Sequence, residues 1–316
     1  MQLDVVTVGE SMVLFVAEQA GPLREATTFR RHIAGAESNV AIGLCRLGHT
    51  AGWLSRLGDD EFGRAILFRV RGEGVDTSRV VLDQIAPTAV VFRDRREVGP
   101  LDVIYYRRGS AASRLCVDDL DAAYISAARF LHLTGITPAL SDSCRETVFA
   151  AAEIARAAGV RVVFDPNYRS KLWHRDQARR VMLDLASRAD IVLPGLDEAE
   201  LLTGESEPEA AARRLAAHGA RSVIVKVGAR GAVALVDDCL IEAPPTRLER
   251  IVDPVGAGDA FAAGLLAGLL REMRIEDALR LANRCGAHAM LSPGDVEGLP
   301  RWDDVAGPVW TGDVRR

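Results

Sequence analysis

The sequence predicts an α/β protein built around a mostly parallel sheet with helices on both faces. Short apolar runs rich in β-branched residues alternate with longer segments rich in Ala, Leu and Arg, which is the pattern of β-α-β units. The runs are continuously apolar, as expected when both faces of a sheet are covered. Strands are expected at residues 5–9, 130–136, 160–165, 190–195 and 222–228. Helices are expected at residues 143–158, 176–188 and 208–218.

Composition and charge favour a small-molecule partner. The 316 residues carry 39 basic and 44 acidic side chains, a formal net charge of −5, so neither a nucleic acid nor a membrane partner is expected. The N-terminal stretch MQLDVVTVGES lacks the features of a signal peptide, and the longest apolar run, residues 260–270, is too short to span a bilayer. The five cysteines are widely spaced, without a C-x-x-C pair, and are expected to be reduced and mostly buried. We therefore expect a soluble, cytoplasmic protein.

One domain is expected over residues 1–304, with a short tail at residues 305–316. The segment 88–108, TAVVFRDRREVGPLDVIYYRR, breaks the α/β pattern, because polar and apolar residues alternate in two strands around a Gly-Pro turn. With residues 11–17 it is expected to form a small β-lid beside the core. An apolar outer face on such a lid favours a homo-oligomer.

The stretch DPVGAGDAFAAGLLAGLL, residues 253–270, has the layout of an anion site. It is expected to follow a short strand at residues 250–252 and to lead into a buried helix over residues 260–270. Gly256 and Gly258 permit backbone conformations in which successive N–H groups converge at the positive end of that helix. Gly264 and Gly268 are expected to allow close packing of the helix.

Asp259 is the candidate general base. The stretch matches neither a P-loop nor a dinucleotide fingerprint, because it has no following Lys and Phe261 stands where a third glycine would be. A carboxylate beside a bound phosphate is unfavourable unless it has a chemical task, and accepting the proton of an attacking hydroxyl is such a task. The alternative is that Asp259 only complements the helix dipole.

Two long motifs in the same order resemble a known family. The stretches AGAESNVAIGLCRLG and SRLGDDEFG, at residues 34–48 and 55–63, and DPVGAGDAFAAG, at residues 253–264, are similar to the two signatures of the ribokinase-like (PfkB) carbohydrate kinases. Three further segments, YYRRGSAAS, LHLTGITPALS and DPNYRSKLW, resemble the 2-keto-3-deoxygluconate kinases of that family. The resemblance implies a ribokinase-like fold and transfer of phosphate from ATP, with Mg²⁺, to a small sugar acid, and it leaves a monovalent cation open.

The resemblance also implies roles for individual residues. Asp259 would be the catalytic base, and the anion hole would comprise Gly256, Ala257 and Gly258. The sugar acid would be bound by Gly35, Asn39, Tyr105, Arg107, Arg169 and Asp295. The nucleotide would be bordered by Asn167, Lys226, Gly228, Gly231 and Asn283.

Local geometry is consistent with part of this assignment. In an extended strand Tyr105 and Arg107 lie on one face, and a guanidinium can bind both oxygens of a sugar-acid carboxylate. Asp165, Asn167 and Arg169 would also share a face if the chain is extended there. Two alternatives stay open: Arg107 as a solvated lid charge, and Arg169 as a structural partner of Asp165.

The chain departs from the family pattern at two positions. Gly195 stands where the family commonly has an asparagine, although Glu198, with an indirect role near magnesium, is present. Val91 stands where a relative has a tyrosine that faces the substrate. A fructokinase-like or other sugar kinase is therefore the alternative enzyme, and a sugar- or nucleotide-sensing binding protein is the alternative without catalysis.

Three other titratable residues receive only structural interpretations. Glu10 and Glu37 are assigned no role: the position of Glu10 is also that of a strand-end carboxylate, and the position of Glu37 is also that of a cap for a helix that begins near Ser38. His132 is expected to be a core residue whose hydrogen bonds are satisfied. The spacing of Cys, His and acidic residues predicts no metal site of their own.

Overall fold

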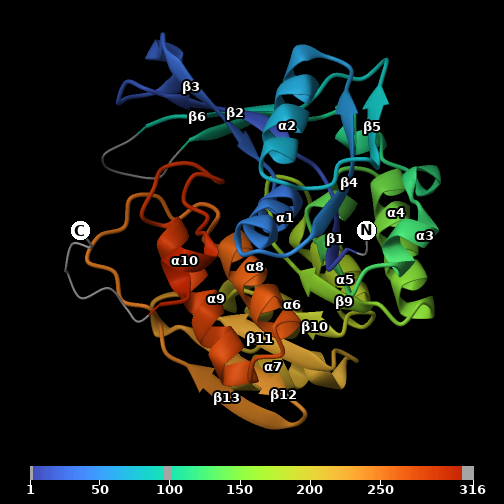
Figure 1. Cartoon of the computed structure of the whole chain (residues 1–316), viewed down its shortest axis with the longest axis vertical. Coiled ribbons are helices and arrows are strands. Elements are labelled where there is room, and N and C mark those ends of the chain that lie inside the picture. Colours follow the sequence, from blue (N-terminus) through green and yellow to red (C-terminus); the bar gives the residue numbers. More distant parts are fainter. Residues whose placement is uncertain (1–2, 96–101, 308–316) are drawn as a thin grey trace.

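A large twisted sheet forms the centre of the computed structural model, which describes residues 3–95 and 102–307 (Figure 1). Within these residues the sheet has nine strands in the order β13-β12-β11-β10-β9-β8-β1-β4-β5. Every pairing from β11 to β5 is parallel, whereas β12 and β13 join one edge in antiparallel orientation. The strands are β1 (Val5–Val8), β4 (Ala51–Gly58), β5 (Val80–Asp83), β8 (Phe130–Thr134), β9 (Arg161–Asp165), β10 (Ile191–Val192), β11 (Ser222–Lys226), β12 (Ala232–Val236) and β13 (Cys239–Ala243).

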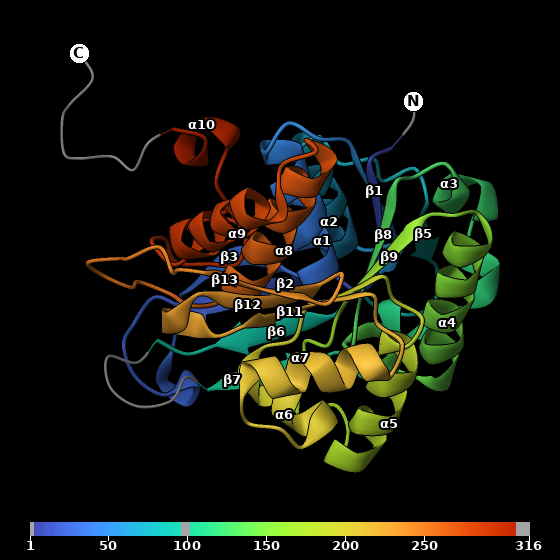
Figure 2. The same cartoon turned by 90° about the horizontal axis from the view of Figure 1, so that it is seen from below.

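Helices cover both faces of the sheet, as Figure 2 shows. One layer consists of α1 (Ala36–Arg46), α2 (Glu61–Gly72), α8 (Ala257–Leu270) and α9 (Ile275–Ala289). The other consists of α3 (Ala122–Ser126), α4 (Asp142–Ala157), α5 (Arg175–Ala186), α6 (Leu196–Thr203) and α7 (Pro208–Ala217). Consecutive strand residues supply opposite layers: Phe130 packs with the first and Leu131 with the second. Both kinds of position are therefore apolar, which explains the continuous runs.

The expected close packing of α8 is confirmed. A Cβ atom on Gly264 would lie 2.9 Å from Cα of Ala282, and one on Gly268 would lie 2.7 Å from Cβ of Ala278, both on α9. Glycine at these two positions lets the helices approach closely. After Asp259, helix α8 is apolar around its whole circumference, because α1 and α9 pack against it and its residues belong to the core on this face of the sheet.

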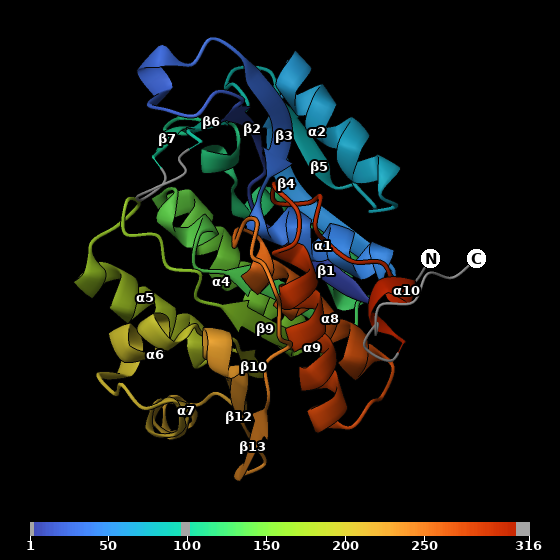
Figure 3. The ribbon, with the colours of Figure 1, turned by 90° about the vertical axis from the view of Figure 1, so that its left-hand side faces the viewer.

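The expected lid is a second sheet, which lies at the opposite end of the molecule from β12 and β13 (Figures 1 and 3). Its described strands are β2 (Met12–Ala17), β3 (Phe29–Ala34), β6 (Val90–Arg93) and β7 (Val103–Tyr106), in the order β3-β2-β6-β7. Pairing is antiparallel except between β2 and β6, which are parallel. Strand β3 was not expected, because its sequence FRRHIA has polar residues at three successive positions. The Gly-Pro turn between β6 and β7 lies outside the described residues.

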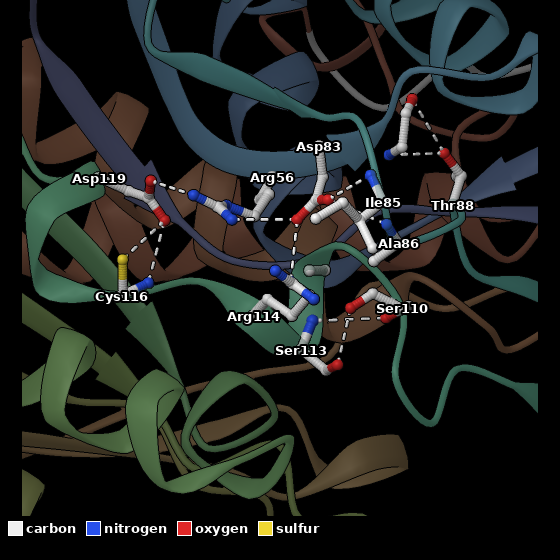
Figure 4. Close-up of polar contacts among 12 residues, drawn as sticks. Arg56, Asp83, Ile85, Ala86, Thr88, Ser110, Ser113, Arg114, Cys116 and Asp119 are labelled. Atoms are coloured by element: carbon white, nitrogen blue, oxygen red, sulfur yellow. Dashed lines mark hydrogen bonds and ion pairs between the residues drawn. The ribbon is translucent and has the colours of Figure 1, made fainter.

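An ion-pair cluster holds the two segments that lead into and out of the lid (Figure 4). Arg56 on β4 donates to Asp83 at 3.0 Å and to Asp119 at 2.8 Å, and Nε of Arg114 lies 3.1 Å from Asp83. Asp83 also accepts two backbone N–H groups from the turn that follows it. The cluster therefore fixes the base of the lid relative to the central sheet.

Two expectations about local structure were wrong. Residues 250–252 form no strand, and the chain reaches Asp253 as an irregular segment. Residues 165–169 are not extended throughout, since β9 ends at Asp165 and Asn167 has a positive φ of 38°. The N–H of Val252 instead donates to the carbonyl of Met290 at 2.8 Å, outside the sheet, and the chain turns after Asp165, where β9 ends.

Two buried titratable residues also differ from expectation. Glu37 does not cap α1 but lies inside its first turn, where the carboxylate accepts hydrogen bonds from Thr134 at 2.6 Å and Thr137 at 2.7 Å. His132 is buried, yet neither ring nitrogen has a hydrogen-bond partner in the described part of the chain. Burial lowers the pKa of His132 to about 4, so the ring is neutral.

The last described helix, α10, packs against the central domain. Helix α10 (Trp302–Val305) packs on α9, and Arg284 donates to the carbonyl of Val305 at 3.1 Å. The cysteines are unpaired; Cys144 and Cys285 are buried, while Cys239 is exposed. Within the described ranges, no helix is both long and apolar enough to cross a membrane.

Candidate active site

A cavity of about 870 Å³ lies between the lid and the carboxyl ends of the central strands. Ligands of parallel α/β sheets bind at this end because the loops that follow the strands converge there. The strand ends contribute Glu10, Asp165, Gly195 and Lys226. The lid contributes Met12, Leu14, Val91, Arg93, Val103, Tyr105 and Arg107.

Asp259 lies in the first turn of α8 and faces this cavity. Its side chain accepts a hydrogen bond from Nδ2 of Asn39 at 2.8 Å, and Nδ2 of Asn167 lies 3.5 Å from its other oxygen. Burial raises the pKa of Asp259 to about 7, with Asn39 acting in the opposite direction. A carboxyl group with this pKa is suited to accept a proton near neutral pH.

The glycine loop begins α8 with unusual backbone geometry. Gly256 is the N-cap, with φ 79° and ψ −8°, and a Cβ atom there would lie 2.8 Å from the carbonyl oxygen of Asp295. Both the left-handed conformation and the close contact require glycine at this position. The N–H of Ala257 donates to the carbonyl oxygen of Pro254 at 3.4 Å. The other N–H groups of the first turn, including that of Gly258, have no acceptor within the helix. They form a positive pole at the cavity wall.

Two further carboxylates and an amine lie next to this pole. Nζ of Lys226 donates to Asp165 at 2.6 Å and would lie 3.7 Å from a Cβ atom on Gly258. Burial alone would lower the pKa of Lys226, but Asp165 and Glu198 together raise it, so the amine is charged. Glu198 accepts the backbone N–H groups of Gly195 and Tyr168, both at 2.7 Å. The glycine at 195 therefore positions Glu198 through its backbone.

Arg169 and Asp295 also line this cavity. Within the described ranges the Arg169 guanidinium has no ion-pair partner, so it is not a structural partner of Asp165. Its charge lowers the pKa of both Asp259 and Asp295, although burial outweighs it at each. Burial raises the pKa of Asp295 to about 6.

The lid contributes a ring and a guanidinium to the cavity, as the strand geometry predicts. The Arg107 guanidinium carbon lies 5.4 Å from the centre of the Tyr105 ring. Arg107 is 9% exposed and donates through Nη2 to Glu10, whose other oxygen accepts from Ser110 at 3.2 Å. Arg107 is therefore not a solvated lid charge. Its Nε is buried and has no hydrogen-bond partner among the residues that the structure describes.

Gly35 lines the cavity between the end of the lid strand β3 and the start of α1. A Cβ atom there would lie 2.4 Å from the carbonyl oxygen of Glu10, so only glycine fits between the lid strand and α1. The N–H of Asn39 donates to the Gly35 carbonyl at 2.8 Å, which begins α1 and aims the Asn39 amide at Asp259.

Three of the residues expected at the nucleotide lie outside the described cavity lining: Gly228, Gly231 and Asn283. A Cβ atom on Gly231 would lie 2.1 Å from the carbonyl oxygen of Ala243, so this glycine serves close packing. Asn283 donates to the carbonyl groups of Ala243 at 3.3 Å and Pro244 at 2.9 Å. Lys226 and Asn167, in contrast, do line the cavity.

Several residues at the site had received no role from the sequence. Glu10 is buried after β1, Arg93 is buried at the end of the lid strand β6, and Asp253 is buried before the glycine loop. The alternating pattern of the lid strands predicts that one face is buried, but it does not predict what a buried charge contacts. These partners lie far away in the chain, and no local signal identifies them.

Residues 2–302 match the pfkB family of carbohydrate kinases. The chain belongs to this family. The pfkB-family chain is 43% identical over 309 residues to a 2-dehydro-3-deoxygluconokinase of Bacillus subtilis, covering 97% of this chain and 95% of the relative. It is 37% identical to a 2-dehydro-3-deoxygluconokinase of Thermoproteus tenax, covering 94% and 91%. It is 35% identical to Fructokinase-1 of Zea mays, covering 95% and 96%.

Solved structures agree with this membership of the pfkB family. A PfkB protein from Polaromonas superimposes with a TM-score of 0.89 at 42% identity, covering 97% of this chain and 100% of that one. A putative ribokinase II from E. coli, in complex with ATP and Mg²⁺, gives 0.89 at 27% identity, covering 96% and 98%. The predicted ribokinase-like fold is confirmed, and the protein is a phosphotransferase of the carbohydrate kinase type.

Proposed function

We propose that this kinase transfers the γ-phosphoryl group of ATP to the terminal hydroxyl of 2-keto-3-deoxy-D-gluconate, giving 2-keto-3-deoxy-6-phosphogluconate. The observation that supports an acid substrate is the pair Arg107 and Arg169, two guanidinium groups that line one cavity. A guanidinium binds a carboxylate through parallel hydrogen bonds, which a neutral sugar cannot supply. The two relatives named 2-dehydro-3-deoxygluconokinase support the same acceptor.

In the proposed reaction Asp259 accepts the proton of the attacking hydroxyl. Asn39 holds one carboxylate oxygen at 2.8 Å, which leaves the other directed toward Asn167 and the cavity. The N–H groups of the 256–258 loop, at the positive end of α8, stabilise negative charge on the transferred phosphoryl group. Lys226, beside Gly258, adds a full positive charge at the same place. The sugar acid is oriented by Gly35, Asn39, Tyr105, Arg107, Arg169 and Asp295.

ATP and Mg²⁺ are proposed as co-substrates, supported by the ligands of the E. coli neighbour. The part of the chain that the structure describes contains no group of three His, Cys, Asp or Glu side chains that would cage a metal. This suits Mg²⁺ held mainly by phosphate and water, which would supply charge neutralisation when bound. Both oxygens of Glu198 already accept backbone N–H groups, so its contact with the metal would be indirect. The nucleotide would extend past Asn167 and Lys226 toward Gly228, Gly231 and Asn283.

Fructose is the alternative acceptor, because the chain is 35% identical to a maize fructokinase over 95% of its length. A coupled assay with Mg·ATP tests both, using 2-keto-3-deoxygluconate, its galactose-derived epimer, fructose and ribose. The proposal expects turnover of the acids with the highest kcat/KM. Good turnover of fructose or ribose without turnover of the acids would refute the proposed substrate.

A further inference from the structure

A buried ion pair joins the lid to the segment before the glycine loop. Arg93, the last residue of β6, donates through Nη2 to Oδ2 of Asp253 at 2.7 Å. Both side chains are 8% exposed, and the two residues are 160 positions apart in the sequence. Arg93 also lines the cavity, so this contact lies at the wall of the site.

Asp253 also binds the loop that begins α8. Its Oδ1 accepts the N–H of Val255 at 3.1 Å, which shapes the turn leading directly into Gly256. Its Oδ2 also accepts the N–H of Gly294 at 3.2 Å, next to Asp295. The carbonyl of Asp295 in turn packs against Gly256, leaving no space for a Cβ atom. One carboxylate therefore fixes both segments that enclose the glycine loop.

Both partners of this contact are charged, and attachment of the lid alone does not require a charged pair. Burying two charges has a large desolvation cost, and apolar side chains of similar volume would fasten the lid at least as well. An ion pair adds directional bonds, here to an aspartate that itself holds two backbone N–H groups. The Arg93 charge also counters the effect of burial on the pKa of Asp295.

We propose that Arg93 is a positioning residue for phosphoryl transfer, through which the lid holds Asp253 and thereby keeps the glycine loop in its anion-binding geometry. Arg93 acts through Asp253 and does not itself touch the transferred group. The inference rests on the glycine loop as the phosphoryl-transfer site of the proposed function, and it is independent of which sugar is the acceptor.

The test compares Arg93→Gln with wild type and with Arg30→Gln, a control on the lid strand β3 whose side chain is 69% exposed. Circular dichroism and thermal unfolding first establish that each variant is folded. We expect Arg93→Gln to lower kcat by about ten- to a hundredfold, since small misplacement of a catalytic group has effects of this size. The KM values for ATP and the acceptor should stay within about threefold of wild type, because ground-state contacts remain.

A second measurement separates positioning from general destabilisation. Binding of ADP is compared with binding of ADP plus aluminium fluoride, which mimics the transferred phosphoryl group. Arg93→Gln should bind ADP as wild type does but lose about tenfold or more of the affinity gained with aluminium fluoride. The double variant Arg93→Gln/Asp253→Asn should lose no more kcat than the worse single variant, because each substitution breaks the same ion pair between Arg93 and Asp253.

The proposal is overturned if folded Arg93→Gln keeps kcat within twofold of wild type, or if only its KM values change. If Arg93→Gln does not fold, the double variant, which buries no unpaired charge, replaces it under the same two criteria. All variants are assayed on the acceptor that wild type uses best. A wrong substrate assignment therefore appears in the wild-type panel, and a wrong role for Arg93 appears in the variants.

Discussion

Replacing Asp259 with Asn should remove most of the activity and also make the fold more stable above pH 7. Asp259 is 9% exposed, and burial raises its pKa from an ordinary 3.8 to about 7. Ionisation of Asp259 in the folded protein therefore lowers the free energy of unfolding. Asn has nearly the same shape, carries no charge and removes that cost, but it cannot accept a proton.

The size of the stability effect follows from the shift in pKa. A difference of about three units corresponds to roughly 4 kcal/mol between the two protonation states. Because the folded state holds its proton more tightly, wild-type stability should fall as the pH rises from about 4 to about 7 and stay low above that range. The variant lacks this loss. At pH 8 we expect Asp259→Asn to unfold several degrees above wild type, whereas near pH 4 the two should differ little.

The loss of activity has its own expected magnitude. A positioned general base contributes on the order of a hundredfold or more to kcat. In wild type, kcat/KM should fall about tenfold per pH unit below about pH 7, as Asp259 becomes protonated. In the variant, kcat/KM should not show this fall below about pH 7.

Thermal unfolding at several pH values and a coupled kinase assay measure both effects. Asp142→Asn is the matched control, because Asp142 also lies in the first helical turn, that of α4, but its side chain is 89% exposed. If Asp259 only complements the helix dipole, both variants should lose a little stability and keep their activity. Near-normal kcat in Asp259→Asn, or lower stability than wild type at pH 8, would refute the reasoning.

Three further predictions concern the neighbours of Asp259. Arg107→Gln should raise KM for an acid substrate by about tenfold or more and change KM for fructose little. The control Arg108→Gln, at an exposed position, should change neither KM. Equal effects of Arg107→Gln on acid and neutral sugars would show that Arg107 is not the carboxylate ligand. Gly256→Ala should lower kcat about a hundredfold, because φ of 79° and a carbonyl at 2.8 Å leave no room for Cβ, and a folded variant with wild-type kcat would contradict this. Asn39→Ala removes a donor that lowers the pKa of Asp259, so the acid limb of kcat/KM should move to higher pH; an unmoved limb would show that another group titrates.

The sequence alone was sufficient for the elements whose signal is local. Continuous apolar runs predict strands that are buried on both faces, and β1, β8, β9 and β11 are found there with both cores supplied from alternate residues. The glycine loop, the apolar helix and the close packing at Gly264 and Gly268 were predictable for the same reason. In each case the physical requirement, such as left-handed φ or a surface without side chains, acts within a few residues.

Tertiary structure decided the lid and the partners of the charged residues. Strand β3 carries three polar residues in succession, and it is a strand because β2 offers it a complete antiparallel partner. Asn39 meets Asp259 across 220 residues, and Arg93 meets Asp253 across 160. A buried charge is stable only with a partner, and which partner it has depends on how distant elements pack. Periodicity along the chain carries no information about that packing, so the sequence identified the candidate base while only the fold showed how it is held.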